Sequence, residues 1–84
     1  MSKTSLDLHE FYNDKNKLEA ALNKVIQDAA ENGTDIVEII HGKGSGQLKK
    51  RVLRFLQQPS IKQLYKRIEK DSKNFGRLFV HFRF

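Results

Sequence analysis

A strand-like run, a glycine-rich turn and a helix-like segment follow one another directly in this sequence, and their order constrains the fold more than any other feature. Residues 36–40 are β-branched and apolar apart from one glutamate, as in a buried strand. The next residues, Gly42–Gly46, hold three glycines with a lysine and a serine between them. Apolar side chains then recur at helical spacing, at Leu48, Val52, Phe55 and Leu56. We therefore predict a strand, a close backbone turn and an amphipathic helix, in that order.

The other segments alternate between strand and helix patterns. Residues 5–11 alternate in polarity and predict a first strand, and residues 77–84 predict a last strand in the same way. After the first strand a helix is predicted. Asn13 or Asp14 caps its start, and Gly33 ends it. Its apolar positions are Leu18, Leu22, Val25, Ile26 and Ala29.

Residues 60–73 fit both a helix and a strand. Ile61, Leu64 and Ile68 recur at helical spacing, whereas the alternation from Lys62 to Ile68 suits a strand with one exposed face. Periodicity alone favours the helix slightly, so the residue pattern leaves both interpretations open.

The order β-α-β-α-(β)-β is typical of α/β proteins, in which right-handed helical crossovers join parallel strands. If the first two strands are parallel neighbours, their carboxyl ends meet at one edge of the sheet. His9 ends the first predicted strand and His41 ends the second. Open α/β sheets bind ligands at such an edge, so we expect both histidines and the glycine turn to form a site there.

The charge of the chain is divided unevenly between its two halves. Residues 1–40 hold 4 Lys or Arg and 8 Asp or Glu, a net charge of −4, whereas residues 41–84 hold 12 and 2, a net charge of +10. A second half this basic favours a polyanionic partner, with nucleic acid ahead of a membrane surface. The alternative is an ordinary basic surface in contact with water.

Composition limits the class of protein. The chain has 84 residues and no cysteine, which predicts one domain over residues 1–84 without disulfides or thiolate metal sites. Residues 1–4 are expected to be a flexible N-terminus. No apolar run approaches the about 18 residues of a membrane span, and residues 1–10 lack the pattern of a signal peptide. We expect a soluble, cytoplasmic and monomeric protein.

The glycine turn has the chemistry of a phosphate site. It is not a Walker loop, because Gly44 rather than Ser or Thr follows Lys43, and it lacks the acidic residue of the dinucleotide fingerprint. Glycines let a ligand approach the backbone, the helix that follows offers free N–H groups, and Lys43 adds a full charge. The alternative is a tight turn with a solvated lysine. The predicted phosphate ligands are His41, Gly42, Lys43, Gly44, Ser45, Gly46, Lys49, Lys50 and Arg54, with Arg51 projecting elsewhere.

Asp7 and His9 share one face of the first predicted strand, because alternate residues of a strand point the same way. An aspartate can orient a histidine that moves protons near neutral pH, although such a pair is also common on ordinary surfaces. The spacing of the three histidines matches no zinc signature. The sequence requires no cofactor, but Asp7 and Glu10 could hold a divalent cation, magnesium or manganese, weakly.

With both motifs placed, the sequence resembles the small MutS-related (Smr) domain family. "LDLHE" at Leu6–Glu10 is similar to the opening motif L-D-L-H-G of that family, and "HGKGSG" at His41–Gly46 is similar to its motif H-G-K-G-[ST]-G. The similarity runs from about Ser5 to the C-terminus. Glu10 departs from the glycine of the family motif, and the glycine-rich stretch that the family carries before its last strand is reduced to Asn74–Gly76.

The resemblance implies a two-layer α/β sandwich, β-α-β-α-β-β, with two helices on a four-stranded mixed sheet. It therefore implies that residues 61–68 form a strand, paired with the strand near residues 77–84. It also implies nucleic-acid binding and endonuclease activity on DNA or RNA, with Asp7, His9 and Lys43 as the catalytic residues. One alternative is a nucleic-acid-binding module without catalysis. Another is a protein-docking domain, which would need an apolar surface patch that the sequence does not identify.

Overall fold

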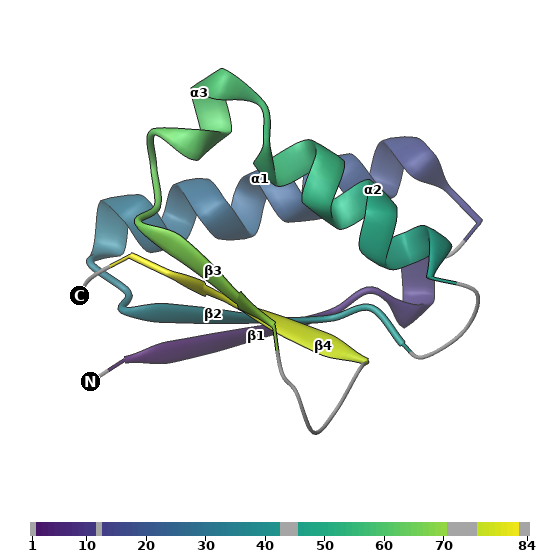
Figure 1. The fold of residues 1–84 in the computed structure, drawn as a ribbon, viewed down its shortest axis with the longest axis horizontal. Coiled ribbons are helices and arrows are strands. Elements are labelled where there is room, and N and C mark those ends of the chain that lie inside the picture. Colours follow the sequence, from purple (N-terminus) through teal and green to yellow (C-terminus); the bar gives the residue numbers. More distant parts are fainter. Residues whose placement is uncertain (1, 12, 43–45, 71–75, 83–84) are drawn as a thin grey trace.

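Four strands form one sheet, and the helices pack against one of its faces (Figure 1). This computed structural model describes residues 2–11, 13–42, 46–70 and 76–82. In chain order the elements are β1 (Lys3–Asp7), the 3₁₀ turn η1 (His9–Phe11), α1 (Lys15–Asn32), β2 (Ile36–Ile40), α2 (Gln47–Leu56), α3 (Pro59–Lys62), β3 (Arg67–Lys70) and β4 (Arg77–His81). The sheet order is β1-β2-β4-β3.

The sheet is mixed. β1 and β2 are parallel, while β4 is antiparallel to both β2 and β3. The prediction of a four-stranded mixed sheet in an α/β sandwich is therefore confirmed. The described residues also form a third helix, α3, which the predicted order β-α-β-α-β-β does not contain.

The predicted strand over residues 61–68 is wrong in its bounds, because that segment divides between two elements. Pro59 occupies the first turn of α3, where its fixed backbone angle suits a helix, and Ile61 is buried against the core. The hydroxyl of Tyr65 donates to the carbonyl oxygen of Leu56 at 2.7 Å and secures the connection. β3 starts only at Arg67 and pairs with β4, so the expected pairing is present over a shorter and later stretch.

β1 also differs in its bounds from the strand predicted over residues 5–11. It starts at Lys3, inside the segment assigned to a flexible N-terminus, and it ends at Asp7. The chain turns there, because the N–H of Phe11 donates to the carbonyl oxygen of Leu8 at 2.9 Å and closes a 3₁₀ turn. His9 therefore lies in this turn and not in the strand.

α1 begins and ends as its residues predict. The side chain of Asp14 accepts the N–H of Lys17 and caps the first turn, while Gly33 takes the left-handed conformation and its N–H donates to Ala29. The apolar sides of the helices and one face of the sheet bury a common core. Its members are Leu8, Leu18, Leu22, Ile26, Ala29, Val37, Ile39, Val52, Phe55, Leu56, Ile61, Leu78 and Val80.

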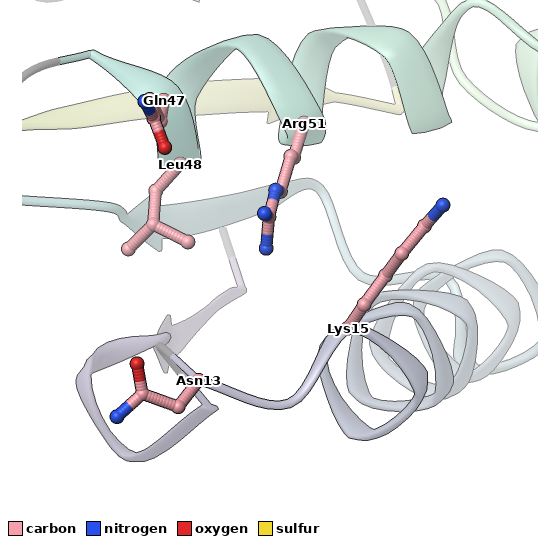
Figure 2. A pocket seen from close by; sticks show the side chains of 5 residues that line it. All are labelled: Asn13, Lys15, Gln47, Leu48 and Arg51. Carbon is pink, nitrogen blue, oxygen red and sulfur yellow. The ribbon is translucent and has the colours of Figure 1, made fainter.

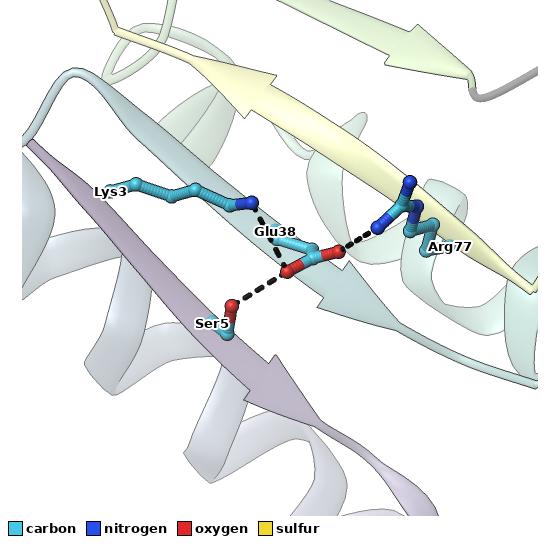
Figure 3. A network of polar contacts seen from close by, with 4 residues as sticks. All are labelled: Lys3, Ser5, Glu38 and Arg77. Atoms are coloured by element: carbon cyan, nitrogen blue, oxygen red, sulfur yellow. Dashed lines mark hydrogen bonds and ion pairs between the residues drawn. The ribbon is translucent and has the colours of Figure 1, made fainter. Parts of the chain in front are cut away.

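The other face of the sheet carries a carboxylate that joins three strands (Figure 3). Glu38 of β2 is only 7% exposed, and its two oxygens accept hydrogen bonds of 2.7 Å from Ser5 of β1 and Arg77 of β4. Lys3 lies 3.5 Å from the same carboxylate. The hydrogen bond from Ser5, with support from Arg77 and Lys3, outweighs partial burial and lowers the pKa of Glu38 below its usual value.

Candidate nucleic-acid interface

The register of β1 and β2 brings the two sequence motifs to one edge of the sheet. Asp7 pairs with Ile40, the last residue of β2, and the N–H of Leu8 donates to the carbonyl oxygen of Ile40 at 3.0 Å. His41 follows Ile40 directly, and His9 follows Leu8, two residues beyond the end of β1. β1 and β2 are thus parallel neighbours, as expected, and the described parts of both motifs lie at the carboxyl ends of these strands.

Asp7 and His9 contact each other in a different way from the one their spacing predicts. The carboxylate of Asp7 accepts the main-chain N–H of His9 at 2.9 Å, and both residues are exposed. Within the described residues, no hydrogen bond joins this carboxylate to the imidazole ring. Asp7 thus holds the backbone at the start of η1, as aspartate commonly does in turns.

His41 faces the core. It is 5% exposed, and its Nδ1 lies 2.9 Å from the carbonyl oxygen of Gly42, which can only accept, so Nδ1 carries the proton. Among the residues that the structure describes, its buried Nε2 has no hydrogen-bond partner. Burial, together with the positive charge of Lys49, lowers the pKa of His41 below its usual value, so the ring is neutral at pH 7.

The backbone of the glycine turn is tied to the start of β4. The N–H groups of His41 and Gly42 both donate to the carbonyl oxygen of Gly76, at 2.8 and 2.9 Å. These two N–H groups and Nδ1 of the His41 ring are therefore engaged within the protein. Direct phosphate contact by His41 and Gly42 stays a prediction, and this geometry favours a role in holding the turn.

Two glycines of the turn have left-handed backbone angles, with φ of +82° at Gly42 and +85° at Gly46. Side chains other than glycine rarely adopt this conformation, which explains the residue type at both positions. Gly46 is also the N-cap of α2 and offers no side chain to its free N–H groups, so these remain suited to an anion. The predicted ligands Lys43, Gly44 and Ser45 lie outside the described residues.

Three of the four exposed residues of α2 are basic, namely Lys50, Arg51 and Arg54. Lys50 and Arg54 are exposed opposite the buried residues of the helix, and Lys49 is half-buried on the flank near His41. α2 contains no acidic residue, and over residues 2–11, 13–42, 46–70 and 76–82 these three side chains make no ion pair. Lys49 and Lys50 thus lie in the first turns of α2, whereas Arg54 lies in its last turn.

Arg51 projects from the other flank of α2, and the pocket that it lines was not predicted from the sequence. This pocket has a volume of about 360 Å³ and lies between the starts of α1 and α2 (Figure 2). Its lining residues are Asn13, Lys15, Gln47, Leu48 and Arg51. Lys15 and Arg51 line the same pocket because of how the two helices pack, which sequence spacing does not show.

The described part of the chain contains no group of three His, Cys, Asp or Glu side chains that could hold a metal ion. The third histidine, His81, contacts Glu69 at 2.7 Å and pairs with Ile36 at the start of β2, away from the candidate site. Within the same residues, no helix has the length and apolar character needed to cross a membrane.

Comparison with known proteins relates this chain to a protein family. A model of the Smr domain matches residues 6–83. No curated protein matches the chain. Among solved structures, the fold is similar to the crystal structure of the Smr domain of Thermus thermophilus MutS2, with a TM-score of 0.70, 15% sequence identity and coverage of 99% of both chains.

Proposed function

The chain belongs to the Smr domain family, and on that basis we propose that it binds nucleic acid and cleaves phosphodiester bonds. One observation supports this proposal: β1 and β2 pair in parallel with Asp7 opposite Ile40, so the turn that holds His9 and the chain from His41 leave the same edge of the sheet. In the proposal, a proton-transfer group and a set of anion-binding groups act together at this edge. Hydrolysis of a phosphodiester needs both kinds of group.

In this proposal the phosphate that is cleaved binds to the free N–H groups at the start of α2, and Lys49, Lys50 and Arg54 contact phosphates along the strand. His9 gives or takes the proton, and Lys43 stabilises the charge that develops on the phosphate. His41 and Gly42 keep the turn in place through their bonds within the turn and to Gly76. A divalent cation, if the reaction uses one, would be held by Asp7 and Glu10, both of which are exposed at this edge.

A second candidate function is nucleic-acid binding without cleavage. One observation favours it: the carboxylate of Asp7 is bonded to the main chain of His9 and not to the ring. A histidine without an orienting partner is a weaker general acid or base. Glu10 also brings a further negative charge to η1, where phosphate would approach.

The deciding experiment compares cleavage of labelled single- and double-stranded DNA and RNA by the wild type, His9→Ala and His81→Ala. Each reaction is run with and without magnesium or manganese, and binding is measured in parallel. We expect His9→Ala to lose cleavage by about 10²–10⁴-fold while it retains binding, because general acid–base catalysis contributes about that much. His81→Ala removes a histidine at the other end of the sheet and serves as the control.

Equal cleavage by wild type and His9→Ala would refute the catalytic role of this histidine. Binding without cleavage of any of the four polymers would establish the second candidate function in its place. Absence of binding to all four would refute both candidates.

A further inference from the structure

The pocket between α1 and α2 is a second feature at this end of the molecule, and the catalytic proposal does not use it. One wall is Gln47, Leu48 and Arg51 of α2, and the facing wall is Asn13 and Lys15 (Figure 2). Both walls continue directly from the candidate site. Gln47 follows the N-cap Gly46, and Asn13 lies just beyond the η1 turn that holds His9.

Two cations line this pocket. Arg51 extends from α2 into the hollow, whereas Lys15 lines it from the first residue of α1 with its ammonium pointing away from Arg51 (Figure 2). None of the lining residues that the structure describes is acidic. Neither cation makes an ion pair or a hydrogen bond within the described residues, and the nearby carboxylate of Asp14 is engaged in capping α1. Arg51 is therefore available to an anion in this pocket, and the flexible side chain of Lys15 adds a second positive charge at its wall.

The size and lining of the pocket indicate more than a simple anion. Its volume of about 360 Å³ falls within the range of about 300–1,000 Å³ that is typical of small-molecule sites. The side-chain amides of Asn13 and Gln47 can donate and accept hydrogen bonds, as the edges of a base or a sugar require. Leu48 is half-buried and supplies an apolar surface. The lining thus suits a phosphate joined to a nucleoside.

We propose that this pocket binds one phosphorylated nucleotide of the nucleic-acid substrate, adjacent to the phosphate that binds at the start of α2. Arg51 and Lys15 contact the phosphate, Arg51 through its planar fork of donors. Asn13 and Gln47 contact the nucleoside. The proposal rests on nucleic-acid binding at the start of α2, but it does not require that cleavage occurs. The phosphate belongs either to the interior of a strand or to its 5′ end.

The test compares Lys15→Gln/Arg51→Gln with Lys24→Gln/Lys62→Gln, which removes the same charge from exposed positions of α1 and α3 outside the site. Fluorescence anisotropy measures binding of short oligonucleotides that carry a 5′-phosphate, carry a 5′-hydroxyl or are circular. We expect the pocket variant to bind about tenfold more weakly and the control variant to bind nearly as the wild type does. The salt slope of log K should fall by about one to two units in the pocket variant alone.

The three oligonucleotides identify the source of the phosphate. An equal loss on all three places an interior phosphate in the pocket, whereas a loss confined to the 5′-phosphorylated strand places the strand end there. Equal affinities of the pocket variant and the control variant would overturn the proposal. Thermal unfolding of both variants checks that the exposed substitutions leave the fold intact.

A titration of the wild type with a nucleoside monophosphate separates this proposal from the function proposed above. We expect the amide resonances of Lys15, Leu48 and Arg51 to shift. Such shifts without any polymer binding would refute the nucleic-acid function and overturn the polymer part of this proposal, because the pocket would then bind a free mononucleotide. No shift, together with no polymer binding, would refute both.

Discussion

The carboxylate of Asp7 accepts a hydrogen bond of 2.9 Å from the main-chain N–H of His9, so the aspartate fixes the position of the histidine through the backbone. This bond lies where β1 ends and the 3₁₀ turn begins. The side chain of His9 is therefore carried by the turn, and the geometry of the turn depends on an oxygen at residue 7.

Asp7→Asn should preserve this turn, because its amide oxygen can accept the same N–H, whereas Asp7→Ala should lose it. Loss of a comparable cap costs about 0.5–2 kcal/mol, so we expect Asp7→Ala to lower the free energy of unfolding by about that amount and Asp7→Asn by less. Urea denaturation of the three proteins measures the difference. Equal destabilisation by both substitutions would show that the bond to His9 is not what Asp7 contributes.

Lys49→Ala/Lys50→Ala should weaken binding to every nucleic acid, because these cations lie beside the glycine turn without ion-pair partners in the described part of the chain. The slope of log K against log salt concentration is about −0.9 per neutralised phosphate on duplex DNA, and it should flatten by about one to two units. Lys24→Ala/Lys62→Ala is the matched control and should leave the slope unchanged. An unchanged slope in the first variant would mean that its lysines contact only water.

His41 should act through the turn and not through charge. We expect His41→Ala to weaken nucleic-acid binding without changing the salt slope, because the ring is neutral and donates to Gly42. His41→Asn can place a donor near the position of Nδ1 and should recover part of the affinity. A flatter slope in His41→Ala would instead indicate that the ring carries charge to a phosphate.

The same residue makes stability depend on pH. Because burial lowers the pKa of His41 below its usual value of 6.5, the folded protein resists protonation there. The unfolded chain then binds the proton more readily, so the free energy of unfolding should fall as the pH falls below about 6.5. His41→Asn should lack this loss. Denaturant unfolding between about pH 7.5 and 5.5 measures the free energy of unfolding of wild type and His41→Asn. The same dependence of this free energy on pH in both proteins would contradict the prediction.

Glu38→Gln should destabilise the protein by about 1–3 kcal/mol at pH 7, because a charged partner of Ser5 and Arg77 becomes neutral. The pKa of Glu38 is lowered, so its carboxylate stabilises the fold above the usual value of 4.5, and this contribution is lost as the pH falls through the lowered pKa. The difference in the free energy of unfolding between wild type and Glu38→Gln should therefore become smaller as the pH falls. A difference in the free energy of unfolding that stays constant from pH 7 to pH 3 would contradict this prediction.

The parts of the fold that depend on neighbouring residues could be predicted from the sequence. The caps at Asp14 and Gly33 and the buried strand before His41 follow from local chemistry, and the structure shows all three. The split of the segment after Pro59 could not be predicted, because Ile61 and Ile68 fit one helical spacing but belong to α3 and β3. Periodicity cannot show where one element stops when both patterns share residues.

Contacts between distant residues could not be predicted either. Glu38 and Arg77 are 39 positions apart, and they meet because the register of β2 against β4 puts them on one face. The bonds from the glycine turn to Gly76 depend on the same register. The end of β1 was missed because a 3₁₀ turn interrupts an alternation that continues in the sequence through His9.

The position of β4 in the sheet determines when the candidate site can form during synthesis. β4 is the last strand of the described chain, yet it lies between β2 and β3, and β3 pairs with it alone. Gly76, which accepts the N–H groups of His41 and Gly42, precedes β4 directly. A nascent chain that has emerged only as far as α2 already presents the basic helix, but nothing yet anchors the turn before it. We therefore expect that anion binding by this turn, if it occurs, requires β4 to be in place.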